Sequence, residues 1–136
     1  PAVEVIAKAC PLFVPLVENG RYRPGDTVIE TVAREYLEPL RQTGIDPLIL
    51  GCTHYPLLMD VIGSVMGPAV TLINASEEAA WDLKRALRDG GLLSPGPGGE
   101  ATLYASDQPS DFRTVAQQFL QEELQKPVLP VDIDRY

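Results

Sequence analysis

Residues 48–58 read Leu-Ile-Leu-Gly-Cys-Thr-His-Tyr-Pro-Leu-Leu, and the fold of the chain is organised around this stretch. A short apolar run stops at Gly51, three polar or reactive side chains follow, and a second apolar run begins at Leu57. Pro56 suits the first turn of a helix, because its missing N–H would have no intrahelical partner there. Apolar residues then recur at spacings of three and four, as on one buried helix face: Leu57, Leu58, Val61, Ile62 and Val65. The pattern predicts a strand, a reactive turn and a helix.

Strand-like and helix-like segments alternate along the rest of the chain. Apolar, partly β-branched runs predict strands at residues 3–9, 48–50, 69–73, 102–105 and 128–131. Helical spacing predicts further helices at residues 27–40, 76–88 and 112–120. Five glycines and two prolines predict a loop at 90–100. This alternation indicates an α/β fold built from parallel βαβ units, in which ligands bind beyond the carboxyl ends of the strands.

Capping signals mark the ends of two of these helices. Thr27 and Glu30 form a capping-box pattern at the start of the first, and Pro39 is expected to kink or interrupt its last turn. Ser76 is the expected N-cap of the second helix. The buried face of that helix is expected to carry Ala79, Ala80, Leu83, Ala86 and Leu87.

Length, charge and cysteine content narrow the class of protein. The chain has 136 residues, 45% of them apolar, and a net charge of -8, which argues against nucleic-acid binding because phosphate contacts need clustered Lys and Arg. No apolar run is long enough to span a membrane, and no secretory signal is expected, because Glu4 and Lys8 interrupt the first apolar stretch. Cys10 and Cys52 are therefore expected to be free thiols in the cytoplasm.

Cys52 is the residue with the richest chemistry. The turn places it beside backbone N–H groups and the positive end of a helix dipole, which favour a thiolate. A thiolate can act as a nucleophile, as a metal ligand or as a base that takes a proton from carbon. A structural zinc site needs four ligands, whereas Cys10, Cys52 and His54 are the whole Cys and His set of the chain, so no metal is expected.

Each candidate residue also has a purely structural interpretation. Cys52 would then be a small buried hydrophobe, His54 a core histidine and Thr53 a helix cap. Glu18 would be a solvated loop acid. Cys10, in apolar sequence with no polar neighbour, is expected to be structural.

Two motifs give the chain a family resemblance. Leu-Gly-Cys-Thr-His-Tyr-Pro-Leu-Leu at 50–58 resembles the second cysteine motif of bacterial glutamate racemases. Ala-Cys-Pro-Leu-Phe-Val-Pro-Leu-Val-Glu at 9–18 resembles the segment that precedes it in that family. Residues 36–40, the helix after Asn74 and the segment 104–120 are similar as well. The resemblance therefore covers the whole chain.

The resemblance implies a cofactor-independent, two-base racemase that interconverts L- and D-glutamate and supplies D-glutamate for peptidoglycan. In that family two cysteines face opposite sides of the substrate α-carbon. Cys52 matches the one that takes the proton from L-glutamate, with His54 and Glu18 as its helpers on the same side. Thr53 matches a position that hydrogen-bonds the substrate, and His54 is expected to line the same site.

The first catalytic cysteine of the family has no counterpart in this chain. That cysteine lies in an N-terminal half and is followed by Asn-Thr, whereas the surroundings of Cys10 match a different part of the family pattern. The chain therefore resembles the C-terminal half of a two-domain, pseudo-symmetric racemase. Residues 1–74 are expected to form most of the second α/β domain, and residues 75–136 to complete the first. The missing half is then the expected partner, a homodimer is left open, and the isolated chain is expected to be inactive.

Alternative functions stay open on the sequence alone. A Cys-His amidase or acyl transferase would use Cys52 as its nucleophile. A racemase of aspartate or another small acid would keep the same chemistry with a different pocket. Some glutamate racemases inhibit DNA gyrase, and no motif in this chain decides for or against that role.

Overall fold

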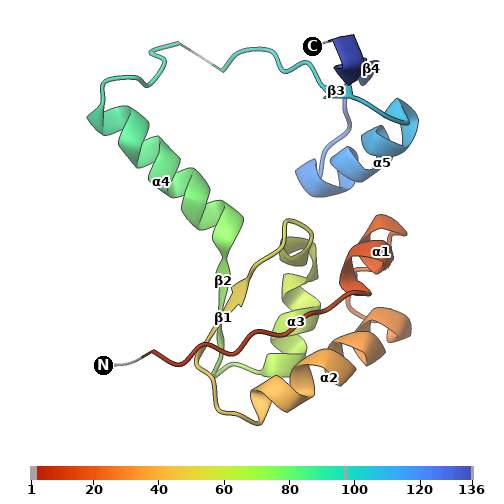
Figure 1. Cartoon of the computed structure of the whole chain (residues 1–136), viewed down its shortest axis with the longest axis vertical. Helices are drawn as coiled ribbons and strands as arrows, with labels where there is room; N and C mark the ends of the chain where they lie inside the picture. Colours follow the sequence, from red (N-terminus) through yellow and green to blue (C-terminus); the bar gives the residue numbers. More distant parts are fainter. Residues whose placement is uncertain (1–2, 97, 136) are drawn as a thin grey trace. The chain divides into compact units, whose positions relative to one another are not determined.

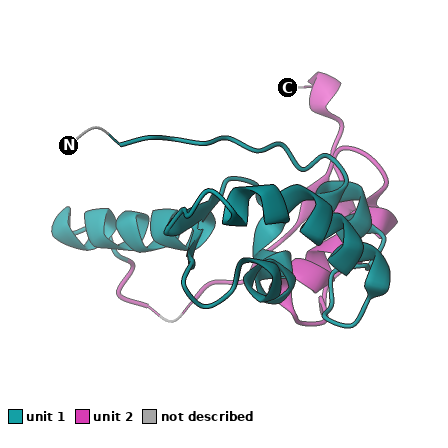
Figure 2. Cartoon of the chain, turned by 90° about the horizontal axis from the view of Figure 1, so that it is seen from below, with its two compact units in different colours: residues 1–93 teal, residues 94–136 magenta. Residues whose placement is uncertain are grey.

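The computed structural model describes residues 3–96 and 98–135, and it divides into two compact units, residues 1–93 and 94–136 (Figures 1 and 2). In the described part of the first unit, parallel strands β1 (Pro47–Leu50) and β2 (Thr71–Asn74) are joined through the 3-10 helix η1 (Tyr55–Leu58) and helix α3 (Met59–Met66). In the second unit, parallel strands β3 (Tyr104–Ala105) and β4 (Leu129–Pro130) are joined through helix α5 (Pro109–Leu120), and the 3-10 helix η2 (Ile133–Arg135) follows. The predicted α/β class with parallel βαβ units is confirmed.

Three further helices belong to the first unit. These are α1 (Phe13–Glu18), α2 (Thr27–Arg41) and α4 (Ala75–Asp89). Helix α2 packs against both α1 and α3, and η1 contacts α1 (Figure 1). Because η1 directly follows the turn at Cys52, this packing brings the reactive turn close to α1.

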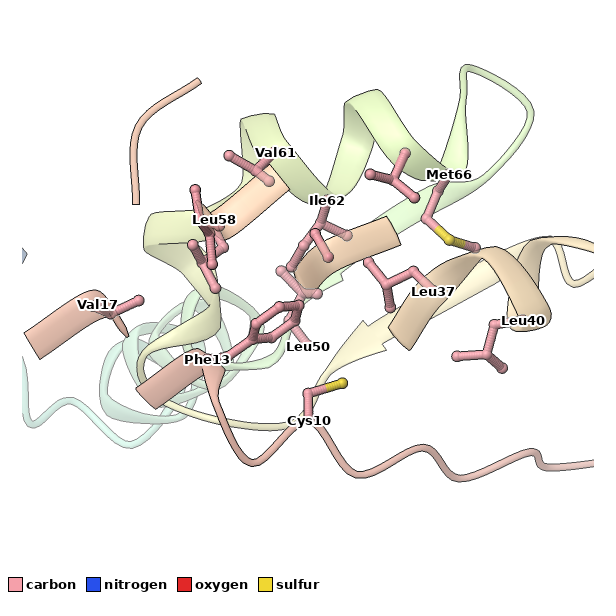
Figure 3. Close-up of a cluster of buried hydrophobic side chains, with 13 residues drawn as sticks. Cys10, Phe13, Val17, Leu37, Leu40, Leu50, Leu58, Val61, Ile62 and Met66 are labelled. Atoms are coloured by element: carbon pink, nitrogen blue, oxygen red, sulfur yellow. The ribbon is translucent and has the colours of Figure 1, made fainter. Parts of the chain in front are cut away.

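A single apolar cluster holds α1, α2, β1 and α3 together (Figure 3). Phe13 lies at its centre with 1% of its surface exposed. The ring of Phe13 makes edge-on contacts with Tyr36 of α2 and Tyr55 of η1, at centroid distances of 5.5 Å and 5.4 Å. Such pairs add to the free energy gained by burial. The other buried members are Cys10, Val17, Ile29, Ala33, Leu37, Leu40, Leu50, Leu58, Val61, Ile62, Val65 and Met66.

The register of the first sheet places two strand ends side by side. Leu50, the last residue of β1, pairs with Asn74, the last residue of β2. The turn at Cys52 follows Leu50 at once, so it lies at the carboxyl edge of a parallel sheet, where α/β proteins bind their ligands.

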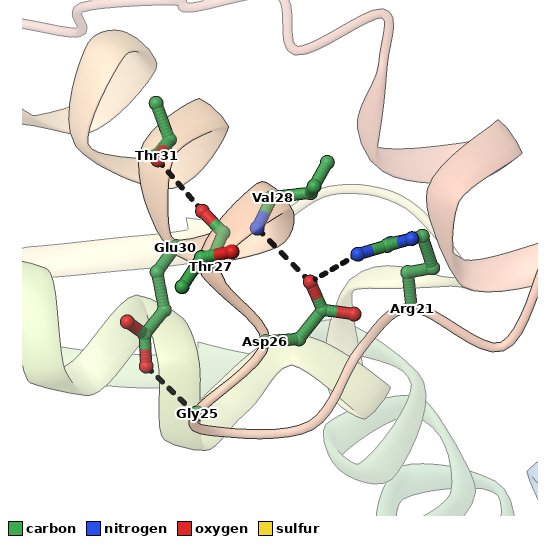
Figure 4. A network of polar contacts seen from close by, with 7 residues as sticks. All are labelled: Arg21, Gly25, Asp26, Thr27, Val28, Glu30 and Thr31. Atoms are coloured by element: carbon green, nitrogen blue, oxygen red, sulfur yellow. Dashed lines mark hydrogen bonds and ion pairs between the residues drawn. The ribbon is translucent and has the colours of Figure 1, made fainter.

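The N-caps of α2 and α4 are not the residues that the sequence predicted. Asp26, not Thr27, caps α2, because its extended backbone lets the carboxylate accept from the N–H of Val28 at 2.9 Å (Figure 4). Glu30 reaches back to the N–H of Gly25 at 2.8 Å. Pro39 does not end α2, which continues to Arg41.

Helix α4 was predicted correctly in extent but not in burial. Asn74, not Ser76, is its N-cap and accepts from the N–H groups of Ser76 and Glu77 at 3.1 Å and 3.3 Å. None of its residues is buried, and its apolar residues Trp81 and Leu83 are 54% and 60% exposed. The expected inner face is therefore not buried within the first unit.

The predicted strand at residues 3–9 is wrong. This segment is exposed throughout and pairs with none of the described strands, so it lacks the backbone hydrogen bonds that define a strand. The remaining predicted strands form, but β2, β3 and β4 are shorter than predicted or displaced by a residue or two. The loop predicted at 90–100 is present over its described residues, and Pro97 lies outside them.

Candidate active site

The turn between β1 and η1 carries Cys52, Thr53 and His54 on consecutive positions. It is closed by two backbone hydrogen bonds, from the N–H of Tyr55 to the carbonyl of Cys52 and from the N–H of Leu57 to the carbonyl of His54, each 3.2 Å long. Pro56 lies in the first turn of η1, as its position in the sequence predicted. Because β1 and η1 are both anchored in the core through Leu50 and Leu58, the turn has two fixed ends.

Glu18 reaches the same place from the end of α1. That helix stops because Gly20 adopts a left-handed conformation, with φ of +76°. The N–H of Gly20 donates to the carbonyl of Val17, and the N–H of Arg21 donates to the carbonyl of Leu16, both at 2.9 Å. This helix-ending motif leaves Glu18 as the last helical residue, with 49% of its side chain exposed.

The imidazole of His54 joins Glu18 and Thr53. Nε2 of His54 lies 3.2 Å from Oε1 of Glu18, and Nδ1 lies 3.2 Å from Oγ1 of Thr53. A carboxylate only accepts hydrogen bonds, so Nε2 carries the proton in this contact, and in the neutral ring Nδ1 then accepts from the Thr53 hydroxyl. The structure thus brings Glu18, Thr53 and His54 together through direct contacts, and the fourth predicted site residue, Cys52, directly precedes Thr53 in the turn.

The two cysteines have different surroundings. Both are free thiols, but Cys10 is 6% exposed within the core, whereas Cys52 is partly exposed at the turn. Burial raises the pKa of the Cys10 thiol, and the positive charge of Lys8 offsets part of that rise. Cys10 therefore has the features of a structural cysteine, as expected.

Tyr55 lies near both cysteines, and no role was predicted for it from the sequence. Its phenol donates a hydrogen bond of 3.5 Å to the carbonyl of Cys10, just before α1. Burial raises the pKa of the phenol, and the nearby thiols of Cys10 and Cys52 raise it further. The signal that could have revealed Tyr55 was its place inside the motif, one residue after His54.

The described residues form neither a metal site of three or more ligands nor a membrane-spanning helix. Across residues 3–96 and 98–135, no group of three or more His, Cys, Asp or Glu side chains is arranged to hold a metal ion. None of the helices in that part of the chain combines the length and apolar character needed to cross a bilayer.

Comparisons with known proteins bear on the identity of the chain. A scan of protein-family models gives no match. The chain is 46% identical over 121 residues to a glutamate racemase of Geobacter metallireducens, and this alignment covers 88% of the chain and 44% of that protein. A crystal structure of glutamate racemase from Thermus thermophilus, in complex with β-chloro-D-alanine, matches with a TM-score of 0.82 and 41% identity over 95% of this chain and 48% of that one. The glutamate racemase of Francisella tularensis in complex with D-glutamate matches with a TM-score of 0.80 and 37% identity, over 93% and 46% of the two chains.

These matches show that the chain is similar in sequence and in fold to one part of the glutamate racemases. The predicted resemblance to glutamate racemases is confirmed in sequence and in structure. The chain spans about half the length of the curated relatives it matches.

Proposed function

We propose that this chain supplies one of the two proton-transfer faces of a glutamate racemase that interconverts L- and D-glutamate without a cofactor. The observation that carries the proposal is the contact between Glu18 and His54 at the carboxyl end of β1, within a turn that also holds Cys52. The likeness to glutamate racemases in sequence and in fold supports the choice of reaction.

The proposed chemistry is a balanced proton transfer. The Cys52 thiolate takes the α-proton of L-glutamate and becomes a thiol, which leaves a carbanion at the α-carbon. The thiol of a second cysteine, on the opposite face and in the half that this chain does not contain, gives its proton to that carbon and becomes a thiolate. The product is D-glutamate, and the reverse reaction exchanges the two roles.

His54 and Glu18 assist Cys52 in this proposal. The Glu18 carboxylate holds the His54 ring by accepting from Nε2, which orients the imidazole two residues after Cys52 in the turn. Thr53 is exposed in the same turn, and because its hydroxyl proton is donated to His54, its oxygen is left to accept a hydrogen bond from the substrate, with His54 as a further substrate contact.

The proposal also covers the whole protein. Residues 1–74 belong to one α/β domain, and residues 75–136 complete the other, whose remainder is the missing half. Trp81 and Leu83 of α4 are exposed apolar residues, and this supports the proposal that α4 packs against the missing half. The complete enzyme works in the cytoplasm, where it supplies D-glutamate for peptidoglycan.

One experiment tests this function directly. The isolated chain is incubated with L-glutamate in deuterated water, and the product of the full open reading frame, called here the complemented enzyme, is tested in parallel. Chiral chromatography should find D-glutamate with the complemented enzyme and none with the isolated chain, because one base cannot deliver a proton to the opposite face. Racemisation by the isolated chain, or a covalent thioester at Cys52, would overturn the proposal.

A further inference from the structure

Tyr55 ties the reactive turn to the start of α1. Its hydroxyl donates to the carbonyl of Cys10, and the same carbonyl accepts from the N–H of Phe13, the first residue of α1, at 3.1 Å. The other end of α1 carries Glu18, which contacts His54. The turn and α1 are therefore joined at two points, one at each end of the helix.

The ring of Tyr55 adds a rigid contact to this link. It meets the Phe13 ring edge-on at a centroid distance of 5.4 Å, with the two planes 89° apart. Phe13 is almost fully buried, so it forms a fixed support. Phe13 also meets Tyr36 edge-on at a centroid distance of 5.5 Å, which links the ring contact to α2.

We infer that Tyr55 is a positioning residue, which sets the distance between the Cys52–His54 turn and α1 and so holds His54 against Glu18. Only the expected effect of Tyr55 on racemisation rests on the proposed function. The geometric part concerns the contact between His54 and Glu18, which exists in this chain whatever the reaction.

The short length of α1 explains how Tyr55, at the start of the helix, affects the contact of Glu18 at its end. The helix has six residues, from Phe13 to Glu18, so its two ends are little more than one turn and a half apart. A shift of the turn relative to the start of α1 is therefore passed almost directly to the contact at its end. Without the Tyr55 hydrogen bond, the ring contact with Phe13 still joins η1 to α1, but the polar link at the start of the helix is lost, and the contact of Glu18 with His54 is held less firmly. An exposed pair of this kind has little energy of its own to hold the geometry.

The variant Tyr55→Phe isolates the hydrogen bond, because it keeps the ring against Phe13 and removes only the hydroxyl. Tyr36→Phe is the matched control, since it removes a hydroxyl from the other ring on Phe13, and among the described residues that hydroxyl has no hydrogen bond. Thermal melting of both variants tells whether the fold is intact.

The first measurement uses the isolated chain and NMR of its one imidazole, His54. The variant Glu18→Gln serves as a reference, because it gives the position of the His54 Cε1–H resonance when the contact with the carboxylate is lost. Tyr55→Phe should move the Cε1–H resonance toward that position, and Tyr36→Phe should leave it unchanged. No movement with Tyr55→Phe, or equal movement with both variants, would overturn the inference.

The second measurement uses the complemented enzyme. Loss of one hydrogen bond predicts that Tyr55→Phe lowers kcat about three- to tenfold in the direction that starts from L-glutamate, with KM nearly unchanged. An unchanged kcat in an active enzyme would contradict the positioning role and leave the racemase proposal intact. If the complemented enzyme did not racemise glutamate but the His54 resonance moved as expected, the racemase proposal would fail and the positioning role would stand.

Discussion

Oε1 of Glu18 lies 3.2 Å from Nε2 of His54, although the two residues are 36 positions apart in the sequence. The contact joins the end of α1 to the turn after β1, and it gives the imidazole a fixed acceptor on the side away from Thr53. It is the relationship on which the proposed assistance to Cys52 depends.

Removal of the Glu18 charge should therefore weaken the complemented enzyme. Glu18→Gln keeps the size of the side chain but replaces the carboxylate with an amide, a weaker acceptor for the Nε2 proton. We expect kcat to fall about tenfold or more, with a smaller change in KM, because the orientation of His54 matters most when the proton moves. Steady-state kinetics in both directions provide the measurement. Glu35→Gln, at an exposed position of α2, is the control, and equal kcat values for the two variants would rule out the role of Glu18.

The two thiols should differ in reactivity in the native chain. Iodoacetamide is expected to modify Cys52, which is partly exposed, at least about tenfold faster than Cys10, which is buried in the core. Peptide mass spectrometry after timed alkylation gives both rates in one sample. In denaturant the two rates should become similar, and native rates that already matched would contradict the structural role of Cys10.

Alkaline pH should destabilise the fold through Cys10. Burial raises the pKa of this thiol above its ordinary value of 9.0, so the folded chain keeps the proton at a pH where the unfolded chain has lost it. The folded state then binds more protons than the unfolded state, and its stability is full below pH 9 and falls as the pH rises further. Urea unfolding followed by circular dichroism should show a loss of stability as the pH rises above 9, and this loss should be smaller in Cys10→Ala. An equal loss in both proteins would show that Cys10 does not cause it.

The cap of α2 should make the chain sensitive to acid. The hydrogen bond from Arg21 lowers the pKa of the Asp26 carboxyl, and the N–H of Val28 lowers it further (Figure 4). The folded chain therefore keeps the Asp26 carboxylate charged at a pH where the unfolded chain is already protonated. The stability that this carboxylate contributes is present above its ordinary pKa of 3.8, and it is lost as the pH falls through the lower pKa of the folded state. Asp26→Ala should lower the melting temperature at pH 7, whereas Asp26→Asn, which still caps the helix, should lower it less. Asp60→Ala, at an exposed position of α3, is the control, and equal melting temperatures for Asp26→Ala and wild type would disprove the role of the cap.

The sequence by itself determined the local features of this protein. The strand at β1, the turn with Cys52, Thr53 and His54, and the apolar face of α3 follow from residues at most a few positions apart, because backbone preferences and helical periodicity act over that range. The motif in that turn was also enough to indicate the racemase family.

Only the tertiary structure decided which distant groups meet at the turn. The contact of Glu18 with His54, and the hydrogen bond of Tyr55 to Cys10, depend on how α1 packs against η1, and no spacing in the sequence encodes that packing. The dependence on tertiary packing also explains why the strand predicted at residues 3–9 and the buried face predicted for α4 were wrong. Their composition predicted a strand and a buried face, but pairing and burial both require a neighbour, and composition does not say whether the fold supplies one.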